Sequence, residues 1–305
     1  MNSSPVAEVP AFHTLWTAPS RARGVAYEFT PWEVVTAVLS VRSWQRFHGP
    51  VRLYTDDAGA HQLDRLGLLD LYADVSTDLD DVTPYDVDPV VYYTGGKLVA
   101  LAAERAPVAM LDLDLFLLSS VDTTCADFVF AHVERATGDI YPPLERLPGT
   151  DRVAGTPPDL AANTALAVFN NERHRAAFTT AARTFMRGNA DPAGCAPVAL
   201  PAFCEQRLVL CEAERLGLSY APVTPAVWDP RERAWSGDTR RAPFHHTWIR
   251  KRLLARDPLR QARYVRRLVT EVARNWPADL DRLTALASLA PAVAEVRSRG
   301  PVSGP

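Results

Sequence analysis

The sequence is poor in cysteine and has no cysteine pair of the kind that binds zinc or exchanges disulfides. Its four cysteines are Cys125, Cys195, Cys204 and Cys211, and none of them forms a C-x-x-C motif. This spacing argues against a zinc knuckle and against a redox motif. We therefore expect buried free thiols, as in a protein from a reducing compartment.

Long apolar runs are also missing. No stretch is long enough to span a bilayer, and the N-terminal MNSSPVAEVP has neither the basic start nor the apolar core of a signal peptide. The net charge is only −3 over 305 residues, so general attraction to nucleic acid or to anionic membranes is not expected. Together these absences predict a cytoplasmic protein without a nucleic-acid partner.

Lysine is scarcer still. Of the 33 lysines and arginines, only Lys97 and Lys251 are lysine. A GC-rich genome drifts toward arginine without any requirement of the protein, so chance is one explanation. The other is that these two positions need a compact ammonium group that a planar guanidinium cannot replace.

What is present is the pattern of an α/β protein. The first part of the chain, to about residue 135, alternates expected strands with expected helices, which predicts a mostly parallel central sheet flanked by helices. A helix is expected to end near Phe47 and to begin after Thr30, because Thr30 can cap it and Glu33 can reach back to the cap. The other expected elements are strands at 11–17, 51–55, 71–75, 107–111, 127–132, 164–169, 219–223 and 244–248, helices at 95–105, 172–188 and 203–216, and a short helix that ends near Leu66.

The rest of the chain suggests one main domain with an appendage. From Arg250 onward the pattern is helical. We expect a domain over 11–255, a C-terminal helical extension over 256–297, and flexible tails at 1–10 and 298–305. The segment 141–160 is rich in proline and glycine, which predicts a long loop.

Two aspartates follow the most apolar of the expected strands. In extended backbone the side chains of Asp112 and Asp114 face the same side. Two neighbouring carboxylates at the end of a buried strand repel each other and are costly to desolvate. A hard cation, Mn²⁺ or Mg²⁺, removes both costs, and ligands of open α/β sheets bind at this end of the strands. We predict a metal site; the alternative is a pair satisfied by arginines or water.

A D-x-D motif that closes an apolar strand after an α/β region resembles the GT-A glycosyltransferases. Among them, the chain is most similar to glycosyltransferase family 8, the glycogenin-like and bacterial galactosyltransferase group, and to its uncharacterised actinobacterial relatives. The resemblance implies the GT-A fold and the transfer of a sugar, here a hexose, from a nucleoside-diphosphate-sugar donor to an acceptor hydroxyl. It favours a UDP-sugar as the donor. It also implies that Asp112, Asp114 and a histidine bind Mn²⁺ or Mg²⁺.

Other residues fit this resemblance. It implies that Lys97 contacts the donor, that Glu205 and Gln206 face the transferred sugar, and that Asn163 and Asn170 flank a strand that lines the sugar and acceptor site. Near the C-terminus, HHTWIRK resembles a motif with a metal-binding histidine and a diphosphate-binding lysine, here Lys251. His245 keeps that lysine in register, whereas a one-residue contraction selects His246, and both remain candidates.

Three further residues lie at expected strand ends. His13 and Trp16 end the first strand and could contact the nucleotide base, although core packing is nearly as good an explanation for Trp16. Glu134 could reach the acceptor side of the cleft. In an inverting reaction Glu134 or Glu205 would take the acceptor proton, whereas a retaining reaction needs no such base.

The final helices are rich in arginine. Such a run could attract a phosphate-bearing acceptor or give peripheral contact with a membrane surface, but a solvated helix face is the commoner outcome. The basic residues are Arg250, Lys251, Arg252, Arg256, Arg260, Arg263, Arg266 and Arg267.

Two other functions compete with glycosyl transfer. A D-x-D at a strand end also occurs in haloacid dehalogenase-type phosphohydrolases, but there it is expected early in the chain, and here it begins at residue 112. A non-catalytic binding protein of GT-A shape is the second alternative, because the resembled motifs have glycine where this chain has Ala165 and either Ile249 or Trp248. Turnover of a sugar nucleotide with metal separates the three.

Overall fold

The computed structural model describes most of the chain. Cys195, the ends of both expected tails and most of the expected loop at 141–160 lie outside the described residues. The described ranges are 8–82, 87–143, 147, 159–189 and 196–299.

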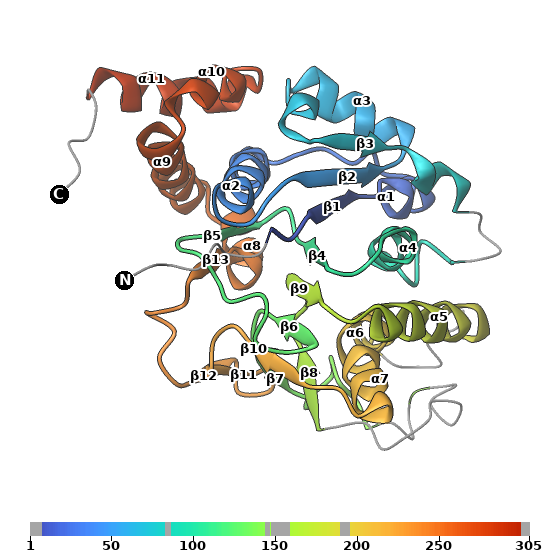
Figure 1. Ribbon diagram of the computed structural model, residues 1–305. Coiled ribbons are helices and arrows are strands. Elements are labelled where there is room, and N and C mark those ends of the chain that lie inside the picture. The colour runs from blue at the N-terminus through green and yellow to red at the C-terminus, as the bar shows by residue number, and fades with distance from the viewer. Residues whose placement is uncertain (1–7, 83–86, 144–146, 148–158, 190–195, 300–305) are drawn as a thin grey trace.

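A mixed seven-stranded sheet forms the centre of the molecule (Figure 1). Its strand order is β10-β6-β9-β4-β1-β2-β3. Four of the neighbouring pairs are parallel and two are antiparallel, because β9 runs against both β4 and β6. The strands are β1 (Ala11–Leu15), β2 (Val51–Thr55), β3 (Asp74–Ser76), β4 (Val108–Leu111), β6 (Phe128–Phe130), β9 (Leu166–Phe169) and β10 (Tyr220–Pro222).

Helices cover both faces of this sheet (Figure 1). Alternate residues of β4 enter two different apolar clusters: Ala109 and Leu111 pack with α2 and α9, whereas Val108 and Met110 pack with α4, α5 and α7. A strand buried on both faces must be apolar throughout, as these four residues are. The helices are α1 (Ala18–Ala22), α2 (Pro31–Phe47), α3 (Asp57–Arg65), α4 (Gly95–Ala103), α5 (Glu172–Gly188), α6 (Ala199–Ala202), α7 (Leu208–Leu216), α8 (Lys251–Arg256), α9 (Pro258–Asn275), α10 (Leu280–Leu283) and α11 (Ala290–Ser298).

The predicted capping box of α2 is confirmed. The Thr30 amide donates to the Glu33 carboxylate over 2.8 Å, and Pro31 takes the first helical position.

The C-terminal helices pack on α2. Arg42 of α2 forms an ion pair with Asp279 at 2.7 Å, and Leu268 and Val272 of α9 share the apolar cluster of α2. The segment expected as a separate extension thus shares a core with the N-terminal half of the chain.

Two smaller sheets place chain segments around the edge of the central one. The first has the strand order β12-β11-β7-β8, and the second pairs β13 with β5. The strand predicted at 127–132 is too long, because β6 ends at Phe130 and the chain then leaves the central sheet to form β7 in the smaller one. The strands are β5 (Leu115–Leu117), β7 (Val133–Arg135), β8 (Leu160–Ala162), β11 (Val227–Asp229), β12 (Ala234–Ser236) and β13 (Phe244–His246).

The helix that carries Glu205 begins earlier than predicted. It starts at Ala199 and continues to Leu216, with a π-helical turn over Phe203–Arg207 between α6 and α7. Pro201 does not prevent this start, because a first helical turn has no intrahelical partner for its amides. Glu205 and Gln206 therefore lie in the π turn, not at a helix start. Such turns are rare and are frequent at functional sites.

The helix ends where predicted, at Gly217, whose φ is 65°, a left-handed conformation that glycine adopts without strain. Among the described helices, none combines the length and the apolar character needed to cross a bilayer.

Candidate active site

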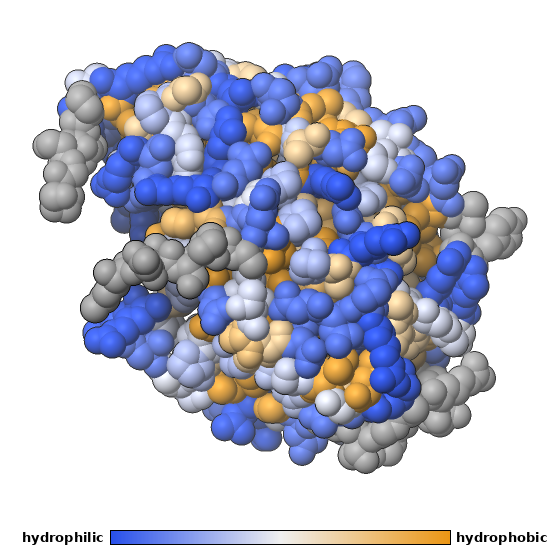
Figure 2. Space-filling model, in the orientation of Figure 1, coloured by the Kyte–Doolittle hydropathy of each residue, from blue (hydrophilic) through white to orange (hydrophobic). Residues whose placement is uncertain are grey.

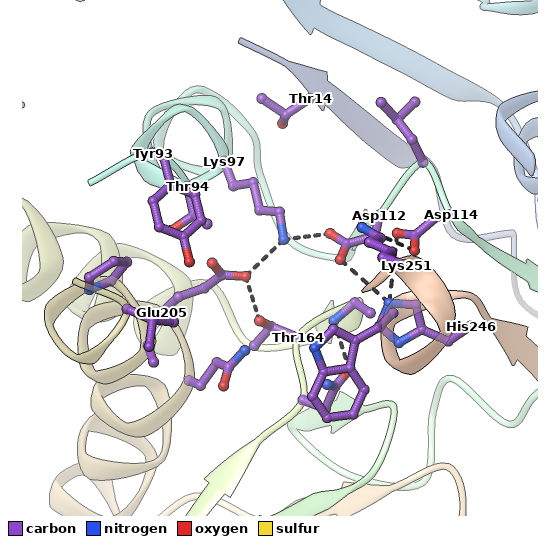
Figure 3. Close-up of a pocket in the computed structure, with 18 of the residues that line it drawn as sticks. Thr14, Tyr93, Thr94, Lys97, Asp112, Asp114, Thr164, Glu205, His246 and Lys251 are labelled. Carbon is purple, nitrogen blue, oxygen red and sulfur yellow. Dashed lines mark hydrogen bonds and ion pairs between the residues drawn. The ribbon is translucent and has the colours of Figure 1, made fainter. Parts of the chain in front are cut away.

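A cavity of about 340 Å³ lies at the ends of β1 and β4. Residues from distant parts of the chain point into it (Figure 3). Many of the polar side chains expected from the sequence line it, together with several that were not expected. The polar lining includes Thr14, Tyr93, Thr94, Lys97, Asp112, Asp114, Glu134, Tyr141, Asn163, Thr164, Glu205, Gln206, His246, Trp248 and Lys251.

Asp112, Asp114 and His246 come together on one side of the cavity. The two aspartates follow β4, and β13 pairs with β5 so that His246 stands opposite Leu115. The Nε2 atom of His246 lies 3.9 Å from Oδ2 of Asp112 and 3.7 Å from Oδ1 of Asp114. One ligand atom from each of the three residues lies within 4.8 Å of the others.

This group suits a divalent cation. Atoms bound at about 2.1 Å to one ion are at most about 4.2 Å apart, and both distances from His246, 3.7 and 3.9 Å, satisfy this limit. Two carboxylates and one imidazole are ligands that Mn²⁺ and Mg²⁺ accept. The structure thus selects His246 over His245 as the histidine of the group.

Both lysines of the chain lie in the same cavity and neutralise the two aspartates. The Nζ atom of Lys251 lies 3.1 Å from Oδ2 of Asp114, and Lys97 forms an ion pair with Asp112. Burial alone would raise the pKa of Asp114, but His246 and Lys251 outweigh burial and lower it well below its ordinary value. Of the alternatives left open by the sequence, a pair satisfied by arginines is wrong: the cations beside the pair are lysines.

Lys97 also joins the aspartates to the opposite side of the cavity. Its Nζ atom lies 2.9 Å from Oε1 of Glu205, which also accepts a 2.6 Å hydrogen bond from the Thr164 hydroxyl. Burial alone would lower the pKa of Lys97, yet the carboxylates of Asp112 and Glu205 raise it well above its ordinary value. Lys97 is therefore a fixed cation between two anions (Figure 3).

Glu134 anchors a second network in the cavity wall. Its Oε1 atom accepts from the Asn163 amide at 2.7 Å, and its Oε2 atom accepts from the Tyr141 hydroxyl at 2.9 Å. Tyr141 also forms a hydrogen bond with Gln206. Since both oxygens of Glu134 hold other side chains, its contacts suit a residue that positions Asn163 and Tyr141.

His13 and His245 lie outside the cavity lining, contrary to the roles expected for them. His13 is fully buried between the Tyr72 hydroxyl at 3.1 Å and the Ser40 hydroxyl at 2.9 Å, and burial lowers its pKa to about 3 although Asp112 opposes this shift. His245 contacts the Tyr264 hydroxyl at 2.7 Å, and burial lowers its pKa to about 4. Adjacent strand residues face opposite sides, so only one of the two neighbouring histidines can face the aspartates.

Trp16 and Asn170 also lie away from the lining. A Cβ atom on Gly96 would come within 3.0 Å of Trp16, so the indole packs directly on the start of α4. The Asn170 side chain donates to the backbone carbonyls of Thr123 and Ala126 at 2.6 and 2.8 Å. These contacts are structural ones. For Trp16, core packing was one of the two explanations that the sequence left open.

The cavity lining also includes Thr164, Tyr141 and Trp248, which were not predicted as site residues. Thr164 occupies an unmarked position in an apolar strand, and Tyr141 opens a segment expected only as a loop. Trp248 stacks on His246 with ring centroids 5.9 Å apart. A local signal existed only for Trp248, which follows the expected metal-binding histidine by two residues.

Comparisons of the sequence with known proteins do not assign a function to this chain. Residues 11–144, less than half of the chain, match a family of unknown function (DUF6734). No curated protein matches the sequence.

Two solved structures are similar over much of the chain. Mouse xyloside xylosyltransferase 1 in its apo form is 11% identical, and the match covers 72% of this chain and 85% of that one with a TM-score of 0.36. PaToxG glycosyltransferase is 8% identical, with 69% and 70% covered and a TM-score of 0.38. Both scores are too low to establish a common fold, so the functional argument comes from the cavity itself.

Proposed function

We propose that this protein is a metal-dependent glycosyltransferase of the GT-A type. It transfers a sugar, a hexose by resemblance to family 8, from a nucleoside-diphosphate donor to an acceptor hydroxyl. The observation that carries this proposal is the Asp112–Asp114–His246 group in a cavity that also contains both lysines of the chain. A volume of about 340 Å³ is in the range of small-molecule sites.

The diphosphate binds beside the aspartates. Bound by Asp112, Asp114 and His246, Mn²⁺ or Mg²⁺ would act as a Lewis acid that offsets the charge of the leaving nucleoside diphosphate. Lys251 contacts Asp114 at 3.1 Å and adds a second positive charge beside the diphosphate of the donor. A UDP-sugar is the favoured donor, by the family resemblance alone, and the cytoplasm is the compartment that we assign.

The transferred sugar lies against Glu205. This carboxylate is paired with Lys97 at 2.9 Å and accepts a hydrogen bond from the Thr164 hydroxyl at 2.6 Å. A carboxylate of this kind is suited to stabilise the positive charge that develops at the sugar carbon, more than to take a proton. Gln206 and Asn163 then contact sugar or acceptor hydroxyls from positions held by Tyr141 and Glu134.

A thermal-shift panel of sugar nucleotides, with and without Mn²⁺, tests the proposal. We expect one nucleotide class to raise the melting temperature only when metal is present. Asp112→Asn should abolish this shift, and Asp64→Asn, an exposed aspartate on α3, is the matched control that should retain it. Flat melting curves across the whole panel would contradict the assignment.

Turnover distinguishes the competing functions. A transferase hydrolyses or transfers from the sugar nucleotide that stabilises it, and only with metal. Release of phosphate from simple phosphate esters would instead identify a phosphohydrolase. A sugar nucleotide that stabilises the protein with metal, but whose sugar is transferred neither to an acceptor nor to water, would identify a binding protein.

A further inference from the structure

A second cavity lies outside the candidate active site, between α8 and α9. Its volume is about 350 Å³. Arginines dominate its polar lining, and no carboxylate of the described residues takes part in it. The lining residues are Arg250, Leu253, Leu254, Arg260, Arg263, Tyr264 and Arg267; we call them the arginine groove.

The positive charge of this region is neutralised only in part. Ion pairs join Lys251 to Asp114 and Arg266 to Glu295. Residues 249–267 contain eight basic side chains and one acidic side chain, Asp257. Asp257 lies 3.5 Å from Arg260, whereas no ion pair within 4.0 Å is found for Arg250, Arg263 or Arg267 among the residues that the structure describes. In a chain with a net charge of −3, this is a local concentration of positive charge.

Apolar side chains are exposed in the same segment. Ile249, Leu253 and Leu259 are 42%, 48% and 71% exposed, and they make up three of the seven large apolar side chains exposed in the described part of the chain. They are not needed for the core, because α9 packs against α2 through other residues, among them Val265 and Leu268. By contrast with these exposed apolar side chains, the surface that Figure 2 shows over α9 and α11 is mainly hydrophilic.

We propose that the arginine groove, with the exposed Leu253 in its lining and the exposed Leu259 on α9, binds the surface of an anionic lipid bilayer. Guanidinium groups form paired hydrogen bonds with phosphate oxygens, and exposed leucines beside basic residues enter the boundary between headgroups and acyl chains. A merely solvated helix face would explain the arginines but not the exposed leucines among them. The proposal goes beyond glycosyl transfer and does not depend on it.

The groove lies close to the candidate active site along the chain. Arg250 lines the groove and the next residue, Lys251, lines the active-site cavity. Tyr264, at the groove, contacts His245 at 2.7 Å and Thr247 at 2.8 Å, on either side of His246. A protein bound to a bilayer through the groove would therefore have its active-site segment near the lipid surface.

Vesicle flotation of the full chain tests the proposal. We expect binding to vesicles of phosphatidylcholine and phosphatidylglycerol in equal parts, weakening as salt is added, and no binding to phosphatidylcholine alone. Arg263→Gln with Arg267→Gln should weaken binding about twenty-five-fold, because each basic residue near an anionic surface contributes about a factor of five. Leu253→Ser with Leu259→Ser should weaken it about tenfold and leave its salt dependence in place.

The control removes the same charge elsewhere. Arg65→Gln with Arg173→Gln changes two exposed arginines on α3 and α5 and should bind as the unchanged chain does, with circular dichroism melting to verify that all variants fold. Equal binding by the groove variant, or equal binding to neutral vesicles, would overturn the proposal. So would self-association that the groove substitutions abolish in a chain that binds no vesicles, since the groove would then be an interface between copies.

Discussion

The two walls of the active-site cavity are built by different means. The metal-group wall consists of Asp112, Asp114, His246 and Lys251. There the His246 ring faces both carboxylates, and Lys251 is paired with Asp114. The helix wall consists of Glu205, Gln206 and Thr164, where one carboxylate is held by a hydroxyl and an ammonium. Lys97 contacts both walls.

This difference indicates two separate functions. A wall with clustered carboxylates needs compensating positive charge, which the lysines supply in the protein alone and a cation can supply in the complex. A wall of directed hydrogen bonds fixes the position of one anion instead. If the comparison is correct, substitutions in the metal-group wall should abolish metal dependence, and those in the helix wall should leave it intact.

The largest effect is expected for Asp114→Asn. It removes one charged ligand while keeping the side-chain shape, so metal-dependent stabilisation by the sugar nucleotide should disappear and turnover should fall about a thousandfold. Turnover with saturating donor and a manganese titration measure both. Full activity of the variant at high manganese would contradict a ligand function for Asp114.

Lys97→Met tests the link between the walls. Without the ammonium, the buried Glu205 and the partly buried Asp112 lose this cation, which should cost about 3 kcal/mol of unfolding free energy in the absence of metal. Manganese should restore more stability to the variant than to the unchanged chain, because the ion no longer competes with Lys97 for Asp112. Urea unfolding with and without manganese measures this.

Arg52→Met is the control for Lys97→Met. It breaks the ion pair with Glu104, 3.2 Å apart and outside the cavity, so manganese should not restore its stability. An equal recovery in both variants would show that the metal acts elsewhere.

The stability that depends on His13 can be compared with that of the cavity, because His13 is a buried residue outside the cavity lining. Its pKa is lowered to about 3 from an ordinary 6.5, so below pH 6.5 the unfolded chain binds a proton that the folded chain does not. The stability due to neutral His13 is complete above pH 6.5 and is lost as the pH falls toward 3, at about 1.4 kcal/mol per pH unit. The stability difference between the unchanged chain and His13→Gln should shrink with that slope.

Urea unfolding over a pH series measures the slope, and His61→Gln, at an exposed position on α3, is the control. A difference that does not change with pH would mean that His13 takes up its proton in the folded state. It would then not be the neutral core residue that its contacts with Tyr72 and Ser40 indicate.

The sequence predicted best what local periodicity determines. Asp112 and Asp114 were predicted as a pair because side chains two apart in a strand face the same way, and the rarity of lysine pointed to Lys97 and Lys251. The pair does converge, but by a different route: β4 ends at Leu111, and both aspartates lie in the turn that leads to β5. The choice between His245 and His246 depends on the register of β13 against β5, a tertiary fact that the sequence left open.

What the sequence missed are neutral partners and buried polar residues. Thr164 and Tyr141 form hydrogen bonds with Glu205 and Gln206, which are 41 and 65 residues away in the chain, and no local pattern marks such pairs. His13 looked like a site residue because it is polar at a strand end, and Asn170 because it closes a motif that resembles one of family 8. The structure satisfies them internally, as buried polar groups require.

The smallest effect is expected for Thr164→Val, which tests whether the two walls are separable. Valine has nearly the same shape as threonine but lacks the hydroxyl that donates to Glu205 over 2.6 Å, so the loss should be about 1.5 kcal/mol of unfolding free energy. Thr179→Val removes a hydroxyl that donates to the Arg175 carbonyl at 3.0 Å inside α5 and serves as the control. Because Lys97 still holds Glu205, manganese should stabilise Thr164→Val in the presence of the sugar nucleotide as much as it stabilises the unchanged chain. A weaker metal response in this variant, with a normal one in the control, would show that the helix wall helps to form the metal site and that the two walls act as one unit.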